Sequence, residues 1–123
     1  MKKILVIEDD ALLRKMFLEC LETEGFHSIG AENGRVGVLK AQEYLPDLVI
    51  CDIIMPELDG YGVLTMLRQN LFTATIAFIF LTGKITEKER CYGMELGADD
   101  YLTKPCTAEQ LLKAIAKVFE PTQ

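Results

Sequence analysis

The stretch Leu48-Val49-Ile50-Cys51-Asp52 is an apolar run that stops at a carboxylate. The same pattern occurs twice more: Ile4-Leu5-Val6-Ile7 leads into Glu8-Asp9-Asp10, and Ile79-Phe80-Leu81 leads into Thr82. Apolar runs of this length, rich in Val and Ile, are typical of strands covered on both faces of a parallel α/β sheet. Because ligands bind at the carboxyl ends of such strands, we expect the functional site at this edge.

The chain as a whole alternates strand and helix patterns five times, which predicts a (βα)5 arrangement with a doubly wound parallel sheet. We expect strands at residues 4–7, 26–31, 47–52, 76–81 and 100–103. Asn33 is the expected cap of the second helix, whose inner face carries Val36 and Leu39 and which Pro46 stops.

The helices differ in the apolar residues that they offer to the core. The first, third and fifth have apolar stripes, and the members of these stripes are Leu12, Leu13, Met16, Phe17, Cys20 and Leu21, then Val63, Leu64 and Leu67, then Leu111, Leu112, Ile115 and Phe119. The fourth, over residues 86–96, is the weakest, because few apolar residues face inward and Gly93 costs about 1 kcal/mol relative to Ala.

Composition narrows the class of protein. The 123 residues are half hydrophobic, which suits one domain, and no segment approaches the roughly 18 apolar residues of a membrane span. A net charge of -6 argues against nucleic acid binding by this domain. The four cysteines form no C-x-x-C pair, so we expect reduced thiols and a cytoplasmic location, and we interpret the single His27 as structural or at the surface.

The residues at the strand ends predict phosphoryl chemistry with a metal. Carboxylates about 4 Å apart repel by about 4 kcal/mol per pair at an effective dielectric constant near 20, so such a cluster needs a cation. Oxygen ligands without His or Cys indicate Mg2+. A carboxylate beside the metal can attack phosphorus, and Asp52 with Lys104 and Thr82 meets the need for a nucleophile, an ammonium and a hydroxyl.

Each of these residues also has an ordinary structural interpretation. Asp9 and Asp10 precede a helix and can cap it, and Asp52 can satisfy backbone donors in a loop. Thr82 suits a turn, and Lys104 suits a solvated surface. The functional interpretation rests on their conjunction at one edge of the sheet.

Four segments resemble the receiver domain of two-component response regulators: ILVIEDD at residues 4–10, PDLVICDIIMPELDG at 46–60, LTG at 81–83 and GADDYLTKP at 97–105. The resemblance covers essentially the whole chain, with a receiver domain over residues 1–120 and a tail or the start of a linker at 121–123. It implies a flavodoxin-like sheet with strand order 2-1-3-4-5.

The resemblance also implies a role for each site residue. Asp52 is the expected phosphoacceptor, Thr82 and Lys104 contact the phosphoryl group, and Tyr101 is the aromatic switch residue that works with Thr82. The remaining implied features are a Mg2+ site made by Glu8 through water, Asp9, Asp52 and the carbonyl of Ile54, and a cis bond at Lys104–Pro105.

The implied function is a phosphorylation-activated signalling switch that catalyses only its own phosphorylation and dephosphorylation. The expected donor is a sensor histidine kinase or a histidine phosphotransfer protein. Phosphorylation should act on the face built by the fourth helix, the last strand and the last helix, where Tyr101 turns inward and a downstream effector binds. We expect a monomer or a weak dimer, with no nucleic acid or membrane partner.

Three alternative functions are open on the same residues. A hydrolase of the haloacid dehalogenase type uses a second acid two residues after the nucleophile, where this chain has Ile54. A flavodoxin-like cofactor binder needs a Ser/Thr/Gly-rich phosphate loop after the first strand, where Glu8-Asp9-Asp10 would repel phosphate. The third is a scaffold without phosphorylation, which the complete set of acid, hydroxyl and amine argues against.

Four positions near the site should affect how fast the phosphoryl group is gained or lost, and not which reaction takes place. Gly83 and Cys106 replace the Ala and the aromatic residue that are frequent in the family, and Gly83 opens the site. Ile54 and Lys84 should border the path of the attacking water, and neither provides the amide or acid that orients it in short-lived relatives. We therefore expect a long-lived phosphorylated state.

Overall fold

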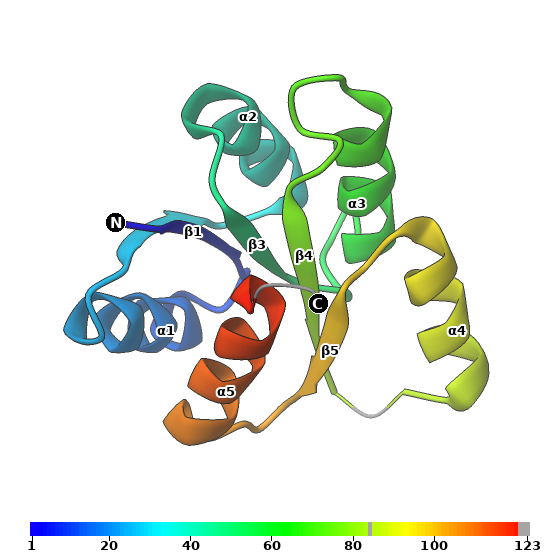
Figure 1. Ribbon diagram of the computed structural model, residues 1–123. Coiled ribbons are helices and arrows are strands. Elements are labelled where there is room, and N and C mark those ends of the chain that lie inside the picture. Colours follow the sequence, from blue (N-terminus) through cyan, green and yellow to red (C-terminus); the bar gives the residue numbers. More distant parts are fainter. Residues whose placement is uncertain (84, 121–123) are drawn as a thin grey trace.

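The sheet is formed by five parallel strands in the order β2-β1-β3-β4-β5 (Figure 1). The computed structural model describes residues 1–83 and 85–120. The strands are β1 (Lys3–Ile7), β2 (His27–Ala31), β3 (Leu48–Asp52), β4 (Ala77–Thr82) and β5 (Asp100–Thr103). The predicted fold class, a doubly wound five-stranded parallel sheet of order 2-1-3-4-5, is confirmed.

Five helices connect and cover the strands: α1 (Ala11–Thr23), α2 (Gly34–Tyr44), α3 (Gly60–Gln69), α4 (Glu87–Leu96) and α5 (Ala108–Phe119). Helices α1 and α5 pack on one face of the sheet, and α2, α3 and α4 lie on the other (Figure 1). Within the described residues, no helix has both the length and the apolar character needed to cross a membrane.

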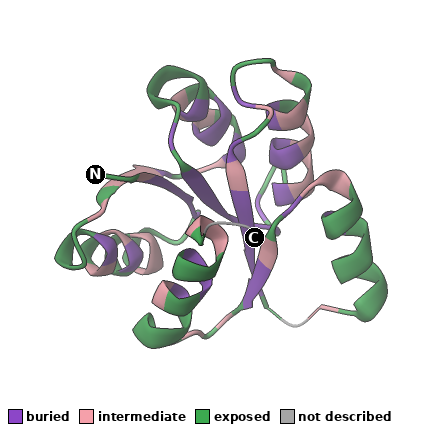
Figure 2. Ribbon diagram, in the orientation of Figure 1, coloured by how far each residue is buried: buried purple, intermediate pink, exposed green. Residues whose placement is uncertain are grey.

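Burial on both faces explains the continuous apolar runs. In β1, Leu5 and Ile7 join the core under α2 and α3, whereas Ile4 and Val6 join the core under α1 and α5. All five residues of β3 are buried, and the centre of the sheet is the most buried part of the molecule (Figure 2). Polar side chains at the ends of these strands are therefore held by a rigid base.

Side chains cap every helix at its start. The caps are Asp10, Asn33, Asp59, Thr86 and Thr107, and each accepts a hydrogen bond from the backbone N–H three residues later. The expected cap at Asn33 is confirmed, and the expected strand and helix ends differ from the observed ones by one residue at several places. Such shifts are common where an element frays at its end.

Three residues that we expected on the inner faces of helices are exposed: Leu39 in α2, and Leu12 and Met16 in α1. Leu39 is 60% exposed, and α2 instead turns Gly34, Gly37, Val38 and Ala41 toward the sheet. The cause is the close approach of α2 to β1: a Cβ atom at Gly37 would overlap the side chain of Ile7. In α1, Phe17 and Leu21 are buried, whereas Leu12 and Met16 are exposed.

Candidate functional site

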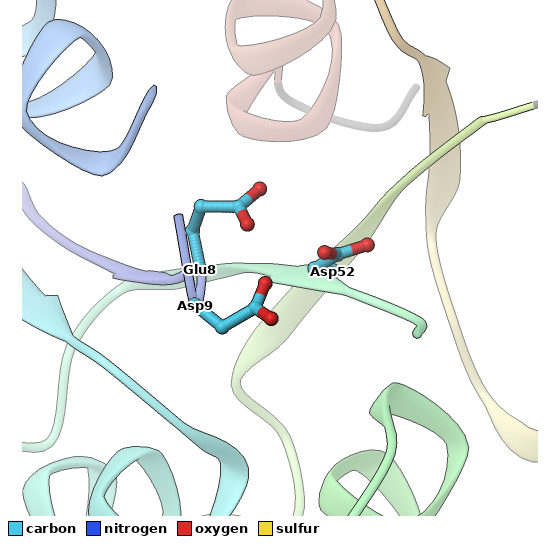
Figure 3. A group of neighbouring side chains, drawn as sticks. All are labelled: Glu8, Asp9 and Asp52. Carbon is cyan, nitrogen blue, oxygen red and sulfur yellow. The ribbon is translucent and has the colours of Figure 1, made fainter. Parts of the chain in front are cut away.

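Three carboxylates meet at the carboxyl edge of the sheet. Glu8 and Asp9 follow β1, and Asp52 is the last residue of β3, which pairs in parallel with β1. One carboxylate oxygen from each of the three residues lies within 4.8 Å of the others (Figure 3). The adjacency of β1 and β3 thus converts two separate acidic segments into one cluster.

The two neighbouring aspartates have different positions. Asp10 caps α1, because its Oδ1 accepts the backbone N–H of Leu13 at 3.1 Å, while Asp9 belongs to the carboxylate cluster. Glu8 and Asp52 are almost fully buried, with 1% and 6% of their surface exposed, whereas Asp9 is exposed. The cluster therefore has two enclosed carboxylates and one at its mouth.

Lys104, which follows β5, brings a positive charge to this cluster. Its Nζ lies 2.7 Å from Oε1 of Glu8 and donates to Oδ2 of Asp52 at 3.0 Å. Burial lowers the pKa of Lys104, but its pairs with the two carboxylates outweigh that effect, so the net shift is upward. Burial also raises the pKa of Glu8 despite the nearby ammonium.

The cluster can hold a metal ion. Among the described residues, three carboxylates face one ammonium, so these groups together carry an excess of negative charge. In addition, Oε1 of Glu8 is buried and makes no aligned hydrogen bond, even though Lys104 is at ion-pair distance. A set of carboxylate oxygens without a His or Cys ligand suits a hard divalent cation.

Thr82 and Tyr101 belong to β4 and β5, the two strands that follow β3 across the sheet. Thr82 is the last residue of β4 and is buried. Tyr101 in β5 is buried too, and its hydroxyl donates to the carbonyl oxygen of Glu89 in α4 at 3.1 Å. The Tyr101 ring is thus already turned inward in this conformation, which is the position that we expected phosphorylation to favour.

The positions that we expected to tune the rate are less enclosed. Ile54 is 80% exposed in the loop after β3, and a Cβ atom at Gly83 would meet nothing within 4 Å. Lys84 lies outside the described residues. The Lys104–Pro105 peptide bond is cis, the isomer that the sequence resemblance implies.

Two residues near the site escaped the sequence reasoning. Arg14 of α1 donates from Nη1 to the carbonyl oxygen of Glu8 at 2.7 Å, and this hydrogen bond fixes the backbone of the segment that follows β1. At Gly60, a Cβ atom would lie 2.5 Å from the carbonyl oxygen of Asp52, so only glycine lets α3 begin this close to the strand end. The available signals were that Arg14 interrupts the apolar stripe of α1 and that Gly60 ends the segment 46–60 that resembles the receiver family.

Comparisons with known proteins agree with this geometry. The sequence profile described as the response regulator receiver domain matches residues 4–116. Protein PilH of Pseudomonas aeruginosa is 38% identical over 119 residues, which cover 97% of this chain and 98% of PilH. The phosphate regulon transcriptional regulatory protein PhoB of Klebsiella pneumoniae is 36% identical over 96% of this chain and 52% of PhoB.

The fold comparison gives a similar result. The solved structure of chemotaxis protein CheY4 of Vibrio cholerae has a TM-score of 0.93 and 28% identity, and the match covers 97% of this chain and 99% of that one. The chain spans about half the length of the transcriptional regulators that it matches and nearly all of PilH.

Proposed function

This chain belongs to the response regulator receiver family, whose members are phosphorylation-activated switches of two-component signalling, and we propose that Asp52 is its phosphoacceptor. The observation that supports this most is the pairing of Lys104 with both Glu8 and Asp52. This pairing places a positive charge beside a buried carboxylate at the carboxyl edge of the sheet. Thr82, the proposed hydroxyl contact of the phosphoryl group, ends β4 at the same edge.

The chemistry follows from what each side chain can do. We propose Mg2+ as the bound metal, held by Glu8, Asp9 and Asp52 with the carbonyl of Ile54, and its contribution is to neutralise charge on the transferring group. An oxygen of Asp52 forms the new O–P bond while the P–N bond to the donor imidazole breaks, and the imidazole leaves with a proton.

Thr82 and Lys104 serve the phosphoryl oxygens in this proposal. The ammonium of Lys104 already lies 3.0 Å from Oδ2 of Asp52, so a phosphoryl group on that residue would find the positive charge in place. The domain then acts as catalyst only for its own phosphorylation and dephosphorylation. Membership of the family implies a histidine kinase partner and a downstream effector.

Finer points of partner choice are proposals as well. We propose that a sensor kinase or a histidine phosphotransfer protein is the donor, and that the effector binds the face formed by α4, β5 and α5. We also propose a cytoplasmic monomer or weak dimer, with a receiver unit over residues 1–120 and a tail at 121–123. These points rest on the family alone.

The test is chemical phosphorylation of the purified chain. Phosphoramidate or acetyl phosphate with Mg2+ should add one phosphoryl group, measured by intact mass. Asp52→Asn should remove the adduct and EDTA should suppress it. The matched control is Asp10→Asn, which should still label because Asn also caps helices and Asp10 lies outside the cluster. Equal labelling of Asp52→Asn, or labelling insensitive to EDTA, would show the assignment to be wrong.

The lifetime of the phosphorylated state is a separate proposal. An exposed Ile54 cannot orient a water molecule, so Ile54→Asn should speed decay of the phosphoprotein by about two- to tenfold, the scale of one hydrogen bond. Decay is followed in Mg2+, with Ile54→Val as the apolar control. If Ile54→Asn decays no faster than wild type, water positioning at this residue does not limit the lifetime. The proposed role of Lys84 rests on sequence.

A further inference from the structure

Tyr61, a residue of α3 with no role in the phosphoryl chemistry, belongs to an aromatic cluster between α3, β4 and α4. Its ring lies edge-on to Phe80 of β4, with centroids 5.2 Å apart, and to Tyr92 of α4, at 5.0 Å. Phe80 also contacts the ring of Tyr101 at 5.2 Å. Tyr61 and Tyr101 therefore both pack on the ring of Phe80, and their hydroxyls lie next to each other beside α4.

The hydroxyl groups of the two tyrosines are in different situations. The Tyr101 hydroxyl donates to the carbonyl of Glu89. The buried Tyr61 hydroxyl lies beside the Tyr101 hydroxyl but makes no aligned hydrogen bond within residues 1–83 and 85–120. Burial raises the pKa of Tyr61 and outweighs the opposite effect of the neighbouring Tyr101 hydroxyl. The charge of Glu89 raises this pKa further, which is consistent with a position near that turn of α4. A buried unpaired hydroxyl is destabilising, so another arrangement that pairs it is favoured.

The Glu89 carbonyl is reached through a gap in α4. A Cβ atom at Gly93 would overlap the Tyr101 hydroxyl oxygen, so the missing side chain of Gly93 is what admits a phenol to this carbonyl. If Tyr101 turns outward, the gap and the carbonyl acceptor remain, and the buried Tyr61 hydroxyl beside them is available as a donor.

We propose that Tyr61 is a positioning residue for α4, whose hydroxyl replaces that of Tyr101 as the donor to the Glu89 carbonyl when Tyr101 turns away. The importance of this exchange for signalling rests on the proposed function. Helix α4 then has two arrangements. In the observed one, Tyr101 donates to the Glu89 carbonyl, and in the proposed alternative Tyr61 donates to it instead.

A double-mutant cycle tests the exchange in the unphosphorylated full chain. Tyr61→Phe is introduced into wild type and into Tyr101→Phe, and the unfolding equilibrium is measured in urea. In wild type the change removes an unpaired hydroxyl and should not destabilise. In the Tyr101→Phe background, Tyr61→Phe removes a hydrogen bond, so it should raise the equilibrium constant of unfolding by about two- to tenfold. Tyr92→Phe, whose residue is 51% exposed, should act equally in both backgrounds.

The reversal of effect separates this proposal from a packing role, which would give Tyr61→Phe the same cost in both backgrounds. Equal effects in the two backgrounds overturn it. Amide exchange in α4 gives a second readout: Tyr61→Phe should slow exchange by about two- to tenfold, because the alternative arrangement loses its donor. Unchanged or faster exchange also overturns it. Neither measurement uses phosphorylation, so failure of Asp52 to accept a phosphoryl group would be seen separately.

Discussion

Helices α4 and α5 begin in the same way and are held very differently. Each opens with a capping box, Thr86 with Glu89 in α4 and Thr107 with Gln110 in α5. After that, α5 buries Leu111, Ala114 and Ile115, whereas α4 buries Gly93 and no other residue. The caps decide where the two helices start, and apolar burial decides how firmly each is attached.

What attaches α4 is mostly polar and aromatic. The Tyr101 hydroxyl bonds to Glu89, and the guanidinium of Arg90 lies over the Tyr101 ring at 5.4 Å and 3.9 Å from Oδ1 of Asp100. Partly exposed ion pairs of this kind contribute about 0–1 kcal/mol. Helix α4 should therefore open locally at a lower free-energy cost than α5, as expected of an element that responds to a signal.

Truncation of a core side chain should show the largest difference. Leu111→Ala in α5 should lower the free energy of unfolding by about 2–5 kcal/mol, because Leu111 is fully buried. Met94→Ala in α4 should lower it by less than about 1 kcal/mol, because Met94 is 42% exposed. Urea unfolding measures both, and similar losses in the two helices would mean that they are equally anchored.

Filling the gap in α4 should have an intermediate effect. In Gly93→Ala, the new Cβ displaces Tyr101 or the helix, at a cost of about 1–3 kcal/mol, against a helix-propensity gain of about 1 kcal/mol. We expect a net loss of about 1 kcal/mol and a Tyr101 side chain that becomes reactive to nitration.

The control for that substitution is Gly83→Ala, which has open space around the added methyl group and should change stability by less than about 0.5 kcal/mol. A Gly93→Ala protein with Tyr101 still protected would contradict the role given to the gap.

Removal of the caps should change stability by no more than Gly93→Ala does, and by least in α4, which makes it the most informative test of the comparison. Thr107→Ala should cost about 1 kcal/mol of global stability, because α5 unfolds with the core. The same change at Thr86 should appear mainly as faster amide exchange within α4, with a global loss below about 0.5 kcal/mol. Thr→Ser at either position keeps the hydroxyl and is the control. Equal global losses would mean that α4 belongs to the same cooperative unit.

The sequence predicts the sheet well because burial on both faces leaves a strong signal. The apolar runs of β1, β3 and β4 end in polar residues whose side chains the parallel register brings together, so Glu8, Asp9 and Asp52 are found without coordinates. Local chemistry was equally informative at Asn33, where a cap was expected and is present.

Features that depend on how closely two elements approach were not predictable. The exposure of Leu39 follows from the contact between Gly37 and Ile7, and the inward Tyr101 follows from the gap at Gly93. The periodicity of apolar residues in a sequence indicates which face of a helix is apolar, but it does not indicate how close the helix lies to the sheet. The position before a helix did not by itself distinguish the cap Asp10 from Asp9, and only the family resemblance assigned Asp9 to the cluster.

Strand β5 is four residues long, and it connects chemistry to recognition. It contains Tyr101, which holds α4, and leads directly into Lys104, which balances charge at Asp52. Substitutions in this strand that alter the contact with α4 can therefore also shift Lys104 relative to Asp52, the proposed phosphoacceptor. If the proposed partner face is right, specificity and reaction rate are coupled through this strand, and a graft of a new partner surface should leave Asp100 to Lys104 intact.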